Sequence, residues 1–579
     1  MDLERSPGHI TLSKAFTRVA DTADTALAVV DAFLRTNADC LDRWWALVRN
    51  GKLLKTDTTA NSISTSAAWD EDSLANSPTD ARDMTIHEND SDSASGQNRL
   101  FVTRDSDIAV LNDTAANTWN ANWWVTTKSQ SSGLALKTGY PHPIEYFPLK
   151  RITLVGDKNL VHTIDKNEAV THSRLILPFY LQVEHIFVTT YRAWILCSNQ
   201  RGGNGAIIEW DGSAETYNRI HDAQSTHPLS GVNYNEIPIV INNRGMILEY
   251  NGNGFVPMVR NGQQIAFPIY EELGNVLAVT SNRPIKPRGM TLADDGLIYI
   301  NAKQPGLASQ RQFGGIYCLN PITGNLYSKY SLGNGGDTDF GQQFIGDPGA
   351  IKAVGATSLA SGGDYLVAGG EIFQDDISSR FAIWNISRNY TSTNRRGHFI
   401  TQYIPAENVQ DWWDSLWVRF GAFRSSEDRI IIKARGVNPL LDANRRHLQG
   451  TITWTAATTF TVTLSASDDS LSVGDEIEVI LGKNAGTMAH ITVISGVHGA
   501  LQTITIDETV SSASGTAYVR FDRWKKLGVI NNTSKYVAPL NIGIQSSFIQ
   551  FKVELRGPAS DFEISNLVVN PDPLTISKR

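Results

Sequence analysis

The sequence has few cysteines and no long apolar run. Its three cysteines, Cys40, Cys197 and Cys318, are far apart in 579 residues. Three isolated thiols cannot build a disulfide framework or a cysteine-based zinc site. No run of about 18 apolar residues occurs, and the first residues lack the basic-then-apolar layout of a secretory signal. We therefore expect a soluble protein without a membrane span, folding without covalent or metal cross-links.

An excess of positive charge is also lacking. The chain has 51 Lys and Arg residues against 59 Asp and Glu residues, a formal net charge of −8. Nucleic acid is not expected as the main partner, because phosphate binding requires concentrated positive charge. Residues 56–98 contain nine acidic residues and only Arg82 as a base, so 1 − 9 = −8 accounts for the whole net charge. This Ser-, Thr- and Asn-rich range predicts an acidic polar linker. A calcium loop at Asp90–Gly96 is disfavoured, since the EF-hand spacing fails.

The longest helical pattern lies near the N-terminus. Apolar residues recur between Ser13 and Asn50 at spacings that mostly keep one helical face, with Ser13 as N-cap and Gly51 just past the end. This pattern predicts an N-terminal helical arm over residues 1–55, anchored by the Trp44-Trp45 pair. Two alternatives remain open for this arm: packing on the protein's own β domain or on a neighbouring subunit.

A recurring element fills the centre of the chain. It is a short apolar run that ends in a bulky residue and is followed by Asp or Asn and a turn, as in Ile207–Gly212 and Ile247–Gly252. The bulky residues of its six copies are Leu111, Ile164, Trp210, Tyr250, Leu319 and Trp384. Hairpin units repeated in this way are typical of a β-propeller. We predict a mainly β fold, with an irregular propeller of six to eight blades over residues 99–447, to which strands at 415–420 and 429–435 belong.

The C-terminal part predicts two further units. Residues 448–523 are rich in Thr, Val and Ile and contain Gly474-Asp-Glu-Ile, which is typical of a turn that enters a strand in a small β-barrel. They predict an inserted small β-barrel-like domain. Phe548–Leu555 alternates apolar residues on one face with Gln550, Lys552 and Glu554 on the other, as a β-strand does. Residues 524–579 are therefore expected to be C-terminal strands that complete the propeller and remove its open edge.

No catalytic motif is present. A nucleophile elbow, a phosphate loop, a His-Glu-x-x-His motif and a dinucleotide fingerprint are all missing. His221 and His227 have no ligand spacing. We considered three acidic clusters as glycosidase carboxylates and two tryptophan pairs as sugar platforms: Asp337/Asp339/Asp347, Glu371/Asp375/Asp376, Asp411/Asp414, Trp123-Trp124 and Trp412-Trp413. Rim loops and buried packing explain them equally well or better. We expect no catalytic, cofactor-binding or metal-binding residues, no cofactor, and no enzymatic activity.

These elements together resemble a known class of protein. The strand, Gly-Pro and strand of Ser547–Asn570, together with Gly474–Gly486, are similar to parts of tailed-bacteriophage virion proteins with a β-propeller, such as the tail nozzle or hub. The resemblance implies a viral structural protein of the virion, assembled in the host cytoplasm. It also implies a homo-oligomeric ring, expected to be sixfold, that contacts neighbouring tail proteins and surrounds the channel for DNA ejection, without gripping the DNA. A glycan- or receptor-binding propeller that contacts a host-surface glycan is the alternative, and a glycan-cleaving enzyme is a weaker one.

Overall fold

The structure is a computed structural model of the 579-residue chain. It describes residues 10–11, 17–21, 30–36, 44–56, 69–88, 98–112, 118–128, 134–224, 226–260, 262–266, 285–303, 314–331, 345–354, 365–374, 378–387, 395–401, 404–405, 412–421, 423, 428–437, 448–465, 470–482, 484, 487–510, 513–522, 524–531, 537–557 and 563–570.

Most of the described chain is β structure, and its larger part forms seven four-stranded antiparallel sheets. The strands of the first four sheets are β3 (Val30–Arg35), β4 (Trp44–Val48), β5 (Leu53–Thr56) and β6 (Trp69–Glu71); β7 (Ala81–His87), β8 (Arg99–Arg104), β9 (Ile108–Asn112) and β10 (Thr118–Asn120); β11 (Ile144–Phe147), β12 (Ile152–Asp157), β13 (Leu160–Asp165) and β14 (Val170–Ile176); and β15 (Leu181–Val188), β16 (Ala193–Asn199), β17 (Ala206–Trp210) and β18 (Arg219–Asp222). Those of the other three are β19 (Pro228–Tyr234), β20 (Ile237–Asn242), β21 (Ile247–Tyr250) and β22 (Phe255–Pro257); β25 (Met290–Leu292), β26 (Ile298–Lys303), β27 (Gly314–Leu319) and β28 (Leu326–Ser331); and β29 (Ile345–Val354), β30 (Tyr365–Gln374), β31 (Ser378–Ser387) and β2 (Thr17–Asp21).

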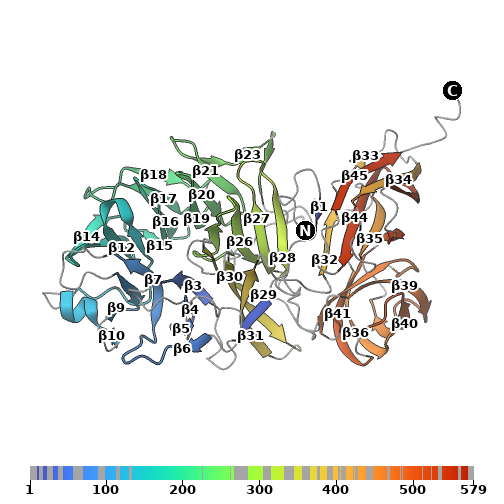
Figure 1. Ribbon diagram of the computed structural model, residues 1–579, viewed down its shortest axis with the longest axis horizontal. Coiled ribbons are helices and arrows are strands. Elements are labelled where there is room, and N and C mark those ends of the chain that lie inside the picture. The colour runs from blue at the N-terminus through green and yellow to red at the C-terminus, as the bar shows by residue number, and fades with distance from the viewer. Residues whose placement is uncertain are drawn as a thin grey trace.

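The first strands of these sheets form a closed cycle. Each of β3, β7, β11, β15, β19, β25 and β29 contacts the next, and β29 returns to β3. The outermost strand of the seventh sheet is β2, which comes from the N-terminal part of the chain and pairs with β31. Radially arranged small antiparallel sheets with contacting inner strands are the architecture of a β-propeller, seen on the left of Figure 1.

The six copies of the sequence repeat occupy the same strand position in their respective sheets. All six bulky residues lie in the third strand of their sheet, in β9, β13, β17, β21, β27 and β31. In four copies the following Asp or Asn accepts two hydrogen bonds from backbone N–H groups of the turn, from Asn167 and Ala169 to Asp165, from Ser213 and Ala214 to Asp211, from Asn253 and Gly254 to Asn251, and from Ile322 and Thr323 to Asn320. These are Asx turns, which explains why the repeat requires a short polar side chain there.

The prediction of an N-terminal helical arm over residues 1–55 is wrong, since β3, β4 and β5 occupy its second half. All five residues of β4 are buried, because this strand lies between two neighbouring sheets. Trp44 packs on the side of the seventh sheet and Trp45 on the side of the second. A strand buried on both faces is continuously apolar, and such a run fits a helical period as well. Gly51, at φ +88°, lies in the β4–β5 turn.

The prediction of an acidic polar linker over residues 56–98 is corrected where the structure describes it. Residues 69–88 contain β6 and β7, so the ring of sheets begins before residue 99. Asp72 accepts hydrogen bonds from Lys55 Nζ at 2.7 Å and from Trp119 Nε1 at 2.6 Å, in a buried position. Acidic residues counted as solvated thus hold the first two sheets together. Asp90 and Asp92 lie outside the described residues.

The C-terminal strands form a β-sandwich instead of completing the ring. One sheet has the order β1 (Ile10–Thr11), β45 (Glu563–Asn570), β34 (Trp412–Phe420) and β43 (Val537–Gln545). The other has the order β32 (Arg395–Ile400), β44 (Phe548–Gly557), β35 (Arg429–Val437) and β42 (Lys525–Ile530), with β33 (Ile404–Pro405) beside β44. Both sheets bury side chains in one core, including Leu416, Ile432 and Phe551. The strands β34 and β35, which we expected in a blade, therefore belong to this sandwich.

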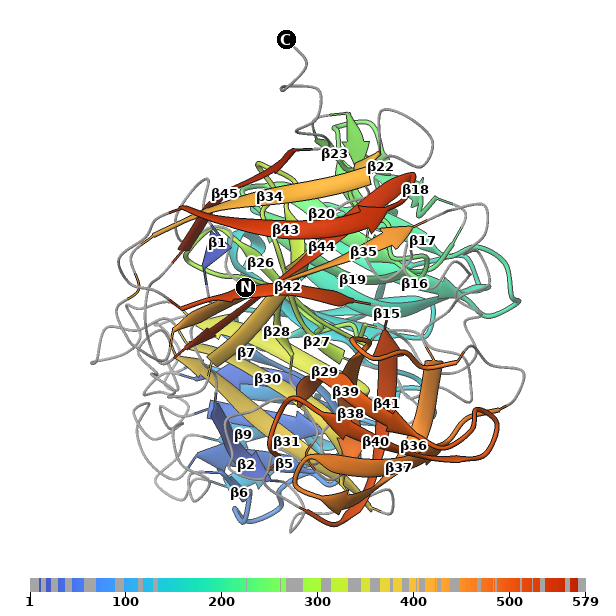
Figure 2. The same ribbon diagram turned by 90° about the vertical axis from the view of Figure 1, so that its right-hand side faces the viewer.

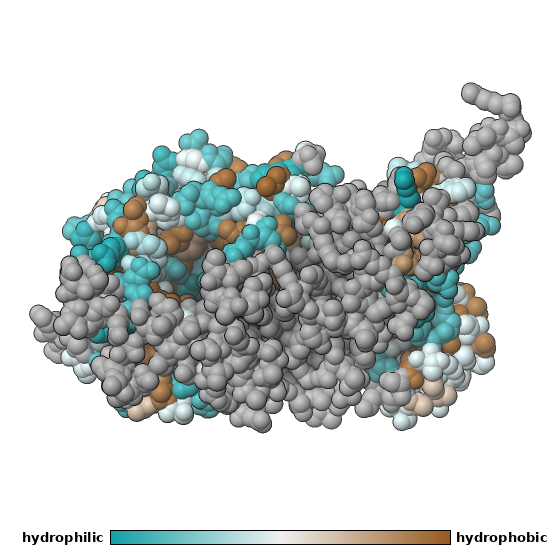
Figure 3. Space-filling model, viewed as in Figure 1, coloured by the Kyte–Doolittle hydropathy of each residue, from teal (hydrophilic) through white to brown (hydrophobic). Residues whose placement is uncertain are grey.

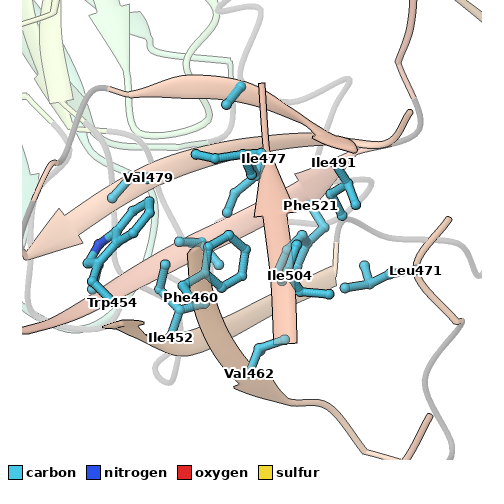
Figure 4. Packing of buried hydrophobic residues seen from close by; sticks show 14 of the residues in the cluster. Ile452, Trp454, Phe460, Val462, Leu471, Ile477, Val479, Ile491, Ile504 and Phe521 are labelled. Carbon is cyan, nitrogen blue, oxygen red and sulfur yellow. The ribbon is translucent and has the colours of Figure 1, made fainter. Parts of the chain in front are cut away.

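A closed six-stranded barrel interrupts the sandwich between β35 and β42. Its strands in spatial order are β36 (Leu448–Ala456), β37 (Thr459–Thr463), β40 (Leu501–Ile506), β39 (Met488–Ser495), β38 (Glu476–Gly482) and β41 (Gly515–Asp522). Strand β41 pairs with both β36 and β38 and so closes it. Figure 4 shows its separate core around Trp454, Phe460 and Ile504.

The three bodies lie next to one another. The sandwich and the barrel stand one above the other beside the ring in Figure 1, and Figure 2 shows both from their own side. Besides a two-stranded β23 (Val259–Arg260) and β24 (Gln263–Gln264) pair, the described residues include the π-helix η5 (Trp123–Lys128) and the 3-10 helix η6 (Pro148–Lys150). No helix in these ranges is long and apolar enough to cross a membrane.

Candidate functional site

Charged side chains from distant sheets meet where the inner strands of the ring begin. Arg288, just before β25, donates to both carboxylate oxygens of Asp83 on β7, at 3.3 and 2.9 Å. It also donates to Glu145 Oε2 on β11 at 2.6 Å and to the Ile144 carbonyl oxygen at 2.7 Å. Because Arg288 belongs to the sixth sheet and its partners to the second and third, the guanidinium group bridges the ring. We call Asp83, Glu145 and Arg288 the axial cluster.

Asp83 is held in place by the backbone around it. Its carboxylate accepts hydrogen bonds from the backbone N–H groups of Met84 at 2.9 Å and Ile144 at 3.0 Å. The loop that carries Arg288 is fixed as well, because Ser230 donates to the Pro287 carbonyl oxygen and Ile351 N–H to that of Arg288. The axial cluster is therefore a built junction between five sheets.

Burial and charge act in opposite directions in this cluster. Burial by itself would lower the pKa of Arg288, but Asp83 and Glu145 raise it above the usual range. Burial lowers the pKa of Lys352 on β29. The charge of Glu145 raises this pKa, and the charge of Arg288 lowers it further. Burial and the charge of Arg288 keep the pKa of His185 on β15 well below its usual value. His185 is thus neutral at pH 7 and Arg288 is charged.

A second charged cluster lies between the sandwich and the barrel. Lys433 on β35 contacts Glu476 on β38 and lies 3.2 Å from Glu554 on β44. Lys552 Nζ donates to Glu476 Oε1 at 2.5 Å, and Arg556 Nε donates to Glu554 Oε1 at 2.5 Å. The side chains of Lys433, Glu476, Lys552 and Glu554 are at most 1% exposed. We call these five residues the junction cluster.

Further ion pairs between the barrel and the sandwich surround the junction cluster. Asp507 and Glu508 of the barrel side lie 3.0 Å from Lys526 and 3.6 Å from Arg556, respectively. Although burial would raise the pKa of Glu554, Lys433 and Arg556 hold it well below its usual range. Burial would likewise raise the pKa of Asp507, but hydrogen bonds from His490 and Lys526 lower it. The acidic side of the barrel thus docks on basic side chains of the sandwich.

Sequence reasoning missed both clusters. Residues of the axial cluster are separated by 62 and 143 positions, and nothing in the local pattern joins them. For the junction cluster an indication existed in the alternating strand Phe548–Leu555. Gln550, Lys552 and Glu554 on its polar face are 7%, 1% and 0% exposed, and Lys552 faces Glu476 of the barrel. Acidic and basic residues that alternate on one strand can therefore indicate a buried charged face.

The residues considered from sequence are largely structural where they are described. His221 is buried and lies 3.2 Å from Glu209. Trp123, Trp124 and Trp413 are at most 2% exposed, so they offer no face to a sugar. The side chains of two acidic clusters, Asp337/Asp339/Asp347 and Glu371/Asp375/Asp376, lie outside the described residues, as do Asp411 and the side chain of Trp412. Within the described ranges, no group of three or more His, Cys, Asp or Glu residues is placed to hold a metal ion.

Comparison with known proteins gives fold-level likeness alone. No family model matches the chain, and no curated protein matches it. Among solved structures, the beta-propeller domain of Myceliophteria thermophila Cps50 (Swd1) aligns with a TM-score of 0.37 and 11% identity, over 65% of this chain and 100% of that one. BBS1N in complex with ARL6DN gives 0.35 and 10%, over 65% and 99%. The computationally designed Ika8 protein gives 0.34 and 9%, over 64% and 100%. Scores this low carry no argument about function.

Proposed function

We propose that this chain is a structural component of a tailed-phage virion, a nozzle- or hub-like subunit that assembles as a ring around the DNA channel of the tail. In this proposal the seven sheets are the blades of one closed propeller, which forms part of the ring wall. The observation that carries the proposal is the way in which the three bodies are joined.

The N-terminal segment joins the ring of sheets to the sandwich. Strand β2 pairs with β31 of the seventh sheet, and β1 pairs with β45 of the sandwich. A short stretch of chain thereby supplies an edge strand to each body. An edge strand that is paired in this way cannot leave without breaking backbone hydrogen bonds. This arrangement resists separation of the two bodies.

The junction cluster joins the sandwich to the barrel. Domains of one chain usually move relative to each other unless their interface is large and apolar. Here the contact is polar, and its buried charges are satisfied only when Glu476 of the barrel faces Lys433 and Lys552 of the sandwich. Buried ionic groups favour one orientation because any other leaves a charge unpaired in a low-dielectric site. A body held in one shape is what a ring subunit needs, since small angular errors accumulate around a closed ring.

Two measurements test the proposal. Sedimentation velocity of the purified chain over a wide range of concentrations is expected to show a closed oligomer of defined size. Immunogold electron microscopy with an antibody against the chain is expected to label one end of purified virions. A strict monomer at all concentrations, together with unlabelled virions, would refute the proposed function.

A further inference from the structure

His490 on β39 lies beside the junction cluster, between two carboxylates of the barrel itself. Its Nδ1 atom is 3.3 Å from Asp507 Oδ2, and because a carboxylate only accepts, Nδ1 carries the hydrogen of this contact. Its Nε2 atom lies 4.0 Å from Glu476 Oε2. This Nε2 is buried and has no hydrogen-bond partner among the described residues. Neutral His490 therefore keeps one buried nitrogen open for a proton.

A proton on that nitrogen would face oxygen atoms that the sandwich already uses. Lys433 Nζ donates to the same Glu476 Oε2, and Lys552 Nζ donates to Glu476 Oε1 at 2.5 Å. Lys526 Nζ donates at 3.0 Å to Asp507 Oδ2, the oxygen that faces His490 Nδ1. Protonated His490 would thus compete with sandwich lysines for both of its neighbouring carboxylates.

The ion pairs of the junction carry equal and opposite charge on the two bodies while His490 is neutral. The barrel contributes three carboxylates, a net −3, and the sandwich contributes four cations and one carboxylate, a net +3. The barrel groups are Glu476, Asp507 and Glu508, and the sandwich groups are Lys433, Lys526, Lys552, Arg556 and Glu554.

The sign of the coupling between docking and protonation follows from these charges. The barrel carboxylates stay beside His490 whether or not the barrel is docked, so only the sandwich changes the surroundings of the proton. Docking brings a net +3 close to His490 and excludes water from it, and both effects oppose a positive charge there. Conversely, a proton reduces the barrel side from −3 to −2 and weakens its attraction to the sandwich.

The contact between the two bodies has no shared apolar core to resist opening. The sandwich core around Leu416 and Phe551 and the barrel core around Trp454 have no residue in common. White and brown surface lies over the outer part of the barrel in Figure 3, away from the charged junction. Bodies of one chain that meet through polar contacts move relative to each other more readily than those joined by a large apolar interface. The barrel sheet is closed by β41, so its own ladder does not depend on docking.

We propose that His490 makes the docking of the barrel on the sandwich sensitive to acid. Histidine is the side chain whose charge ordinarily changes between pH 5 and pH 8. Asp507 and Glu554 keep their charge over that range, because neighbouring cations hold the pKa of each well below its usual value. Docking is therefore strongest at neutral pH and weakens as the pH falls. This device belongs to a single chain and does not depend on ring assembly.

Met488 reports whether the junction is open. It is 8% exposed, and its Sδ atom lies 3.7 Å from Lys552 Nζ across the contact, so release of the barrel exposes its thioether. Peroxide oxidises a thioether to the sulfoxide, and the thioether has no proton of its own to titrate. The experiment measures the oxidation rate of Met488 in the full chain at pH 7.5 and pH 5.5 by peptide mass spectrometry. Met258, at 0% exposure in the propeller, is the internal reference.

The wild-type rate at Met488 is expected to rise at least threefold at pH 5.5 relative to Met258. The rise cannot exceed about tenfold per pH unit, because one proton is linked. His490→Asn places an amide nitrogen near the position of Nδ1, and His490→Phe keeps the ring, but neither takes a proton. Both are expected to show the same Met488 rate at the two pH values, and Trp454 fluorescence reports whether each barrel is folded.

Lys526→Met tests the source of the coupling, because it removes a sandwich cation that opposes the proton. Its rise in Met488 oxidation on acidification is expected to be smaller than that of the wild type. A wild-type rate that is the same at both pH values would overturn the proposal. So would an equal rise in a folded His490→Asn or His490→Phe variant, since the acid effect would then come from another group.

Discussion

The junction cluster predicts an asymmetry between two substitutions that remove opposite charges. Its buried groups are three cations, Lys433, Lys552 and Arg556, and two carboxylates, Glu476 and Glu554. Replacing Glu476 with Gln leaves three cations around one carboxylate. Replacing Lys552 with Met leaves two of each sign. The first change therefore unbalances the buried charge, and the second balances it.

The expected magnitudes follow from this count. Breaking a buried ion pair by removing one partner costs about 3–5 kcal/mol, since the remaining charge is left without compensation. We expect Glu476→Gln to lower the unfolding free energy of the sandwich–barrel unit by about that amount, which is roughly 6–20 °C in Tm for a unit of this size. In Lys552→Met the side chain keeps its apolar stem and Glu476 keeps Lys433, so we expect a loss below about 1.5 kcal/mol.

Urea titration of the full chain measures both effects, and urea is preferred to a guanidinium salt because it does not screen charges. Trp413 lies in the sandwich core and Trp454 in the barrel core, so single Trp→Phe backgrounds show which body unfolds. The double variant Glu476→Gln/Lys552→Met completes the cycle and is expected to be more stable than Glu476→Gln alone. If Lys552→Met costs as much as Glu476→Gln, charge balance does not govern the junction and the reasoning is refuted.

Three further predictions concern the ring. Arg288→Met removes the guanidinium group that Asp83 and Glu145 share, and because the Arg288 and Glu145 side chains are each 23% exposed we expect a cost of about 2–3 kcal/mol in urea titration, below that of a fully buried pair; a cost as small as that of the control Lys352→Met would contradict the axial cluster. Asp211→Ala removes an acceptor of two turn N–H groups and is expected to cost about 1 kcal/mol, whereas Asp211→Asn retains the turn and most of the stability. Because the pKa of His185 is lowered on folding, the unfolded chain binds the proton more tightly, and stability falls as pH drops below about 6.5, by up to about 1.4 kcal/mol per pH unit for this one group. His185→Phe is expected to reduce that slope between pH 7 and pH 5, and an unchanged slope would contradict the assignment.

The local sequence pattern was sufficient to predict those parts of the structure that depend on contacts between residues close together in the sequence. The third strands of six ring sheets could be found from the sequence repeat, and four of them are followed by an Asx turn whose acceptor and donors lie within four residues of one another, as at Asp211 and Asn320. The predominance of β structure followed from the same hairpins. Such turns form through short-range hydrogen bonds, so the residues that they require are adjacent in sequence to the strands that they join.

Strand type was misread where both faces of an element are buried. The run Trp44–Val48 is apolar throughout because it lies between two sheets, and this erased the alternation by which a strand is recognised. The acidic residues of the range 56–98 were interpreted as solvated because their partners are also far away in the sequence. Asp72 and Asp83 satisfy partners 17 to 205 positions away, and a charge in the sequence does not show where its partner lies.

The net charge of −8, the shortage of cysteines and the hairpin repeat are properties of the sequence by itself, and the hairpin repeat determined a β-rich chain. Only the tertiary structure decided which strands pair and which charges are buried. The pairing of β2 with β31, the sandwich made from β34, β35 and β42–β45, and the cover that the barrel places over Lys552 and Glu554 all join distant segments. Such contacts depend on how whole sheets fit together, and the same alternating strand faces water or a buried carboxylate according to what packs against it.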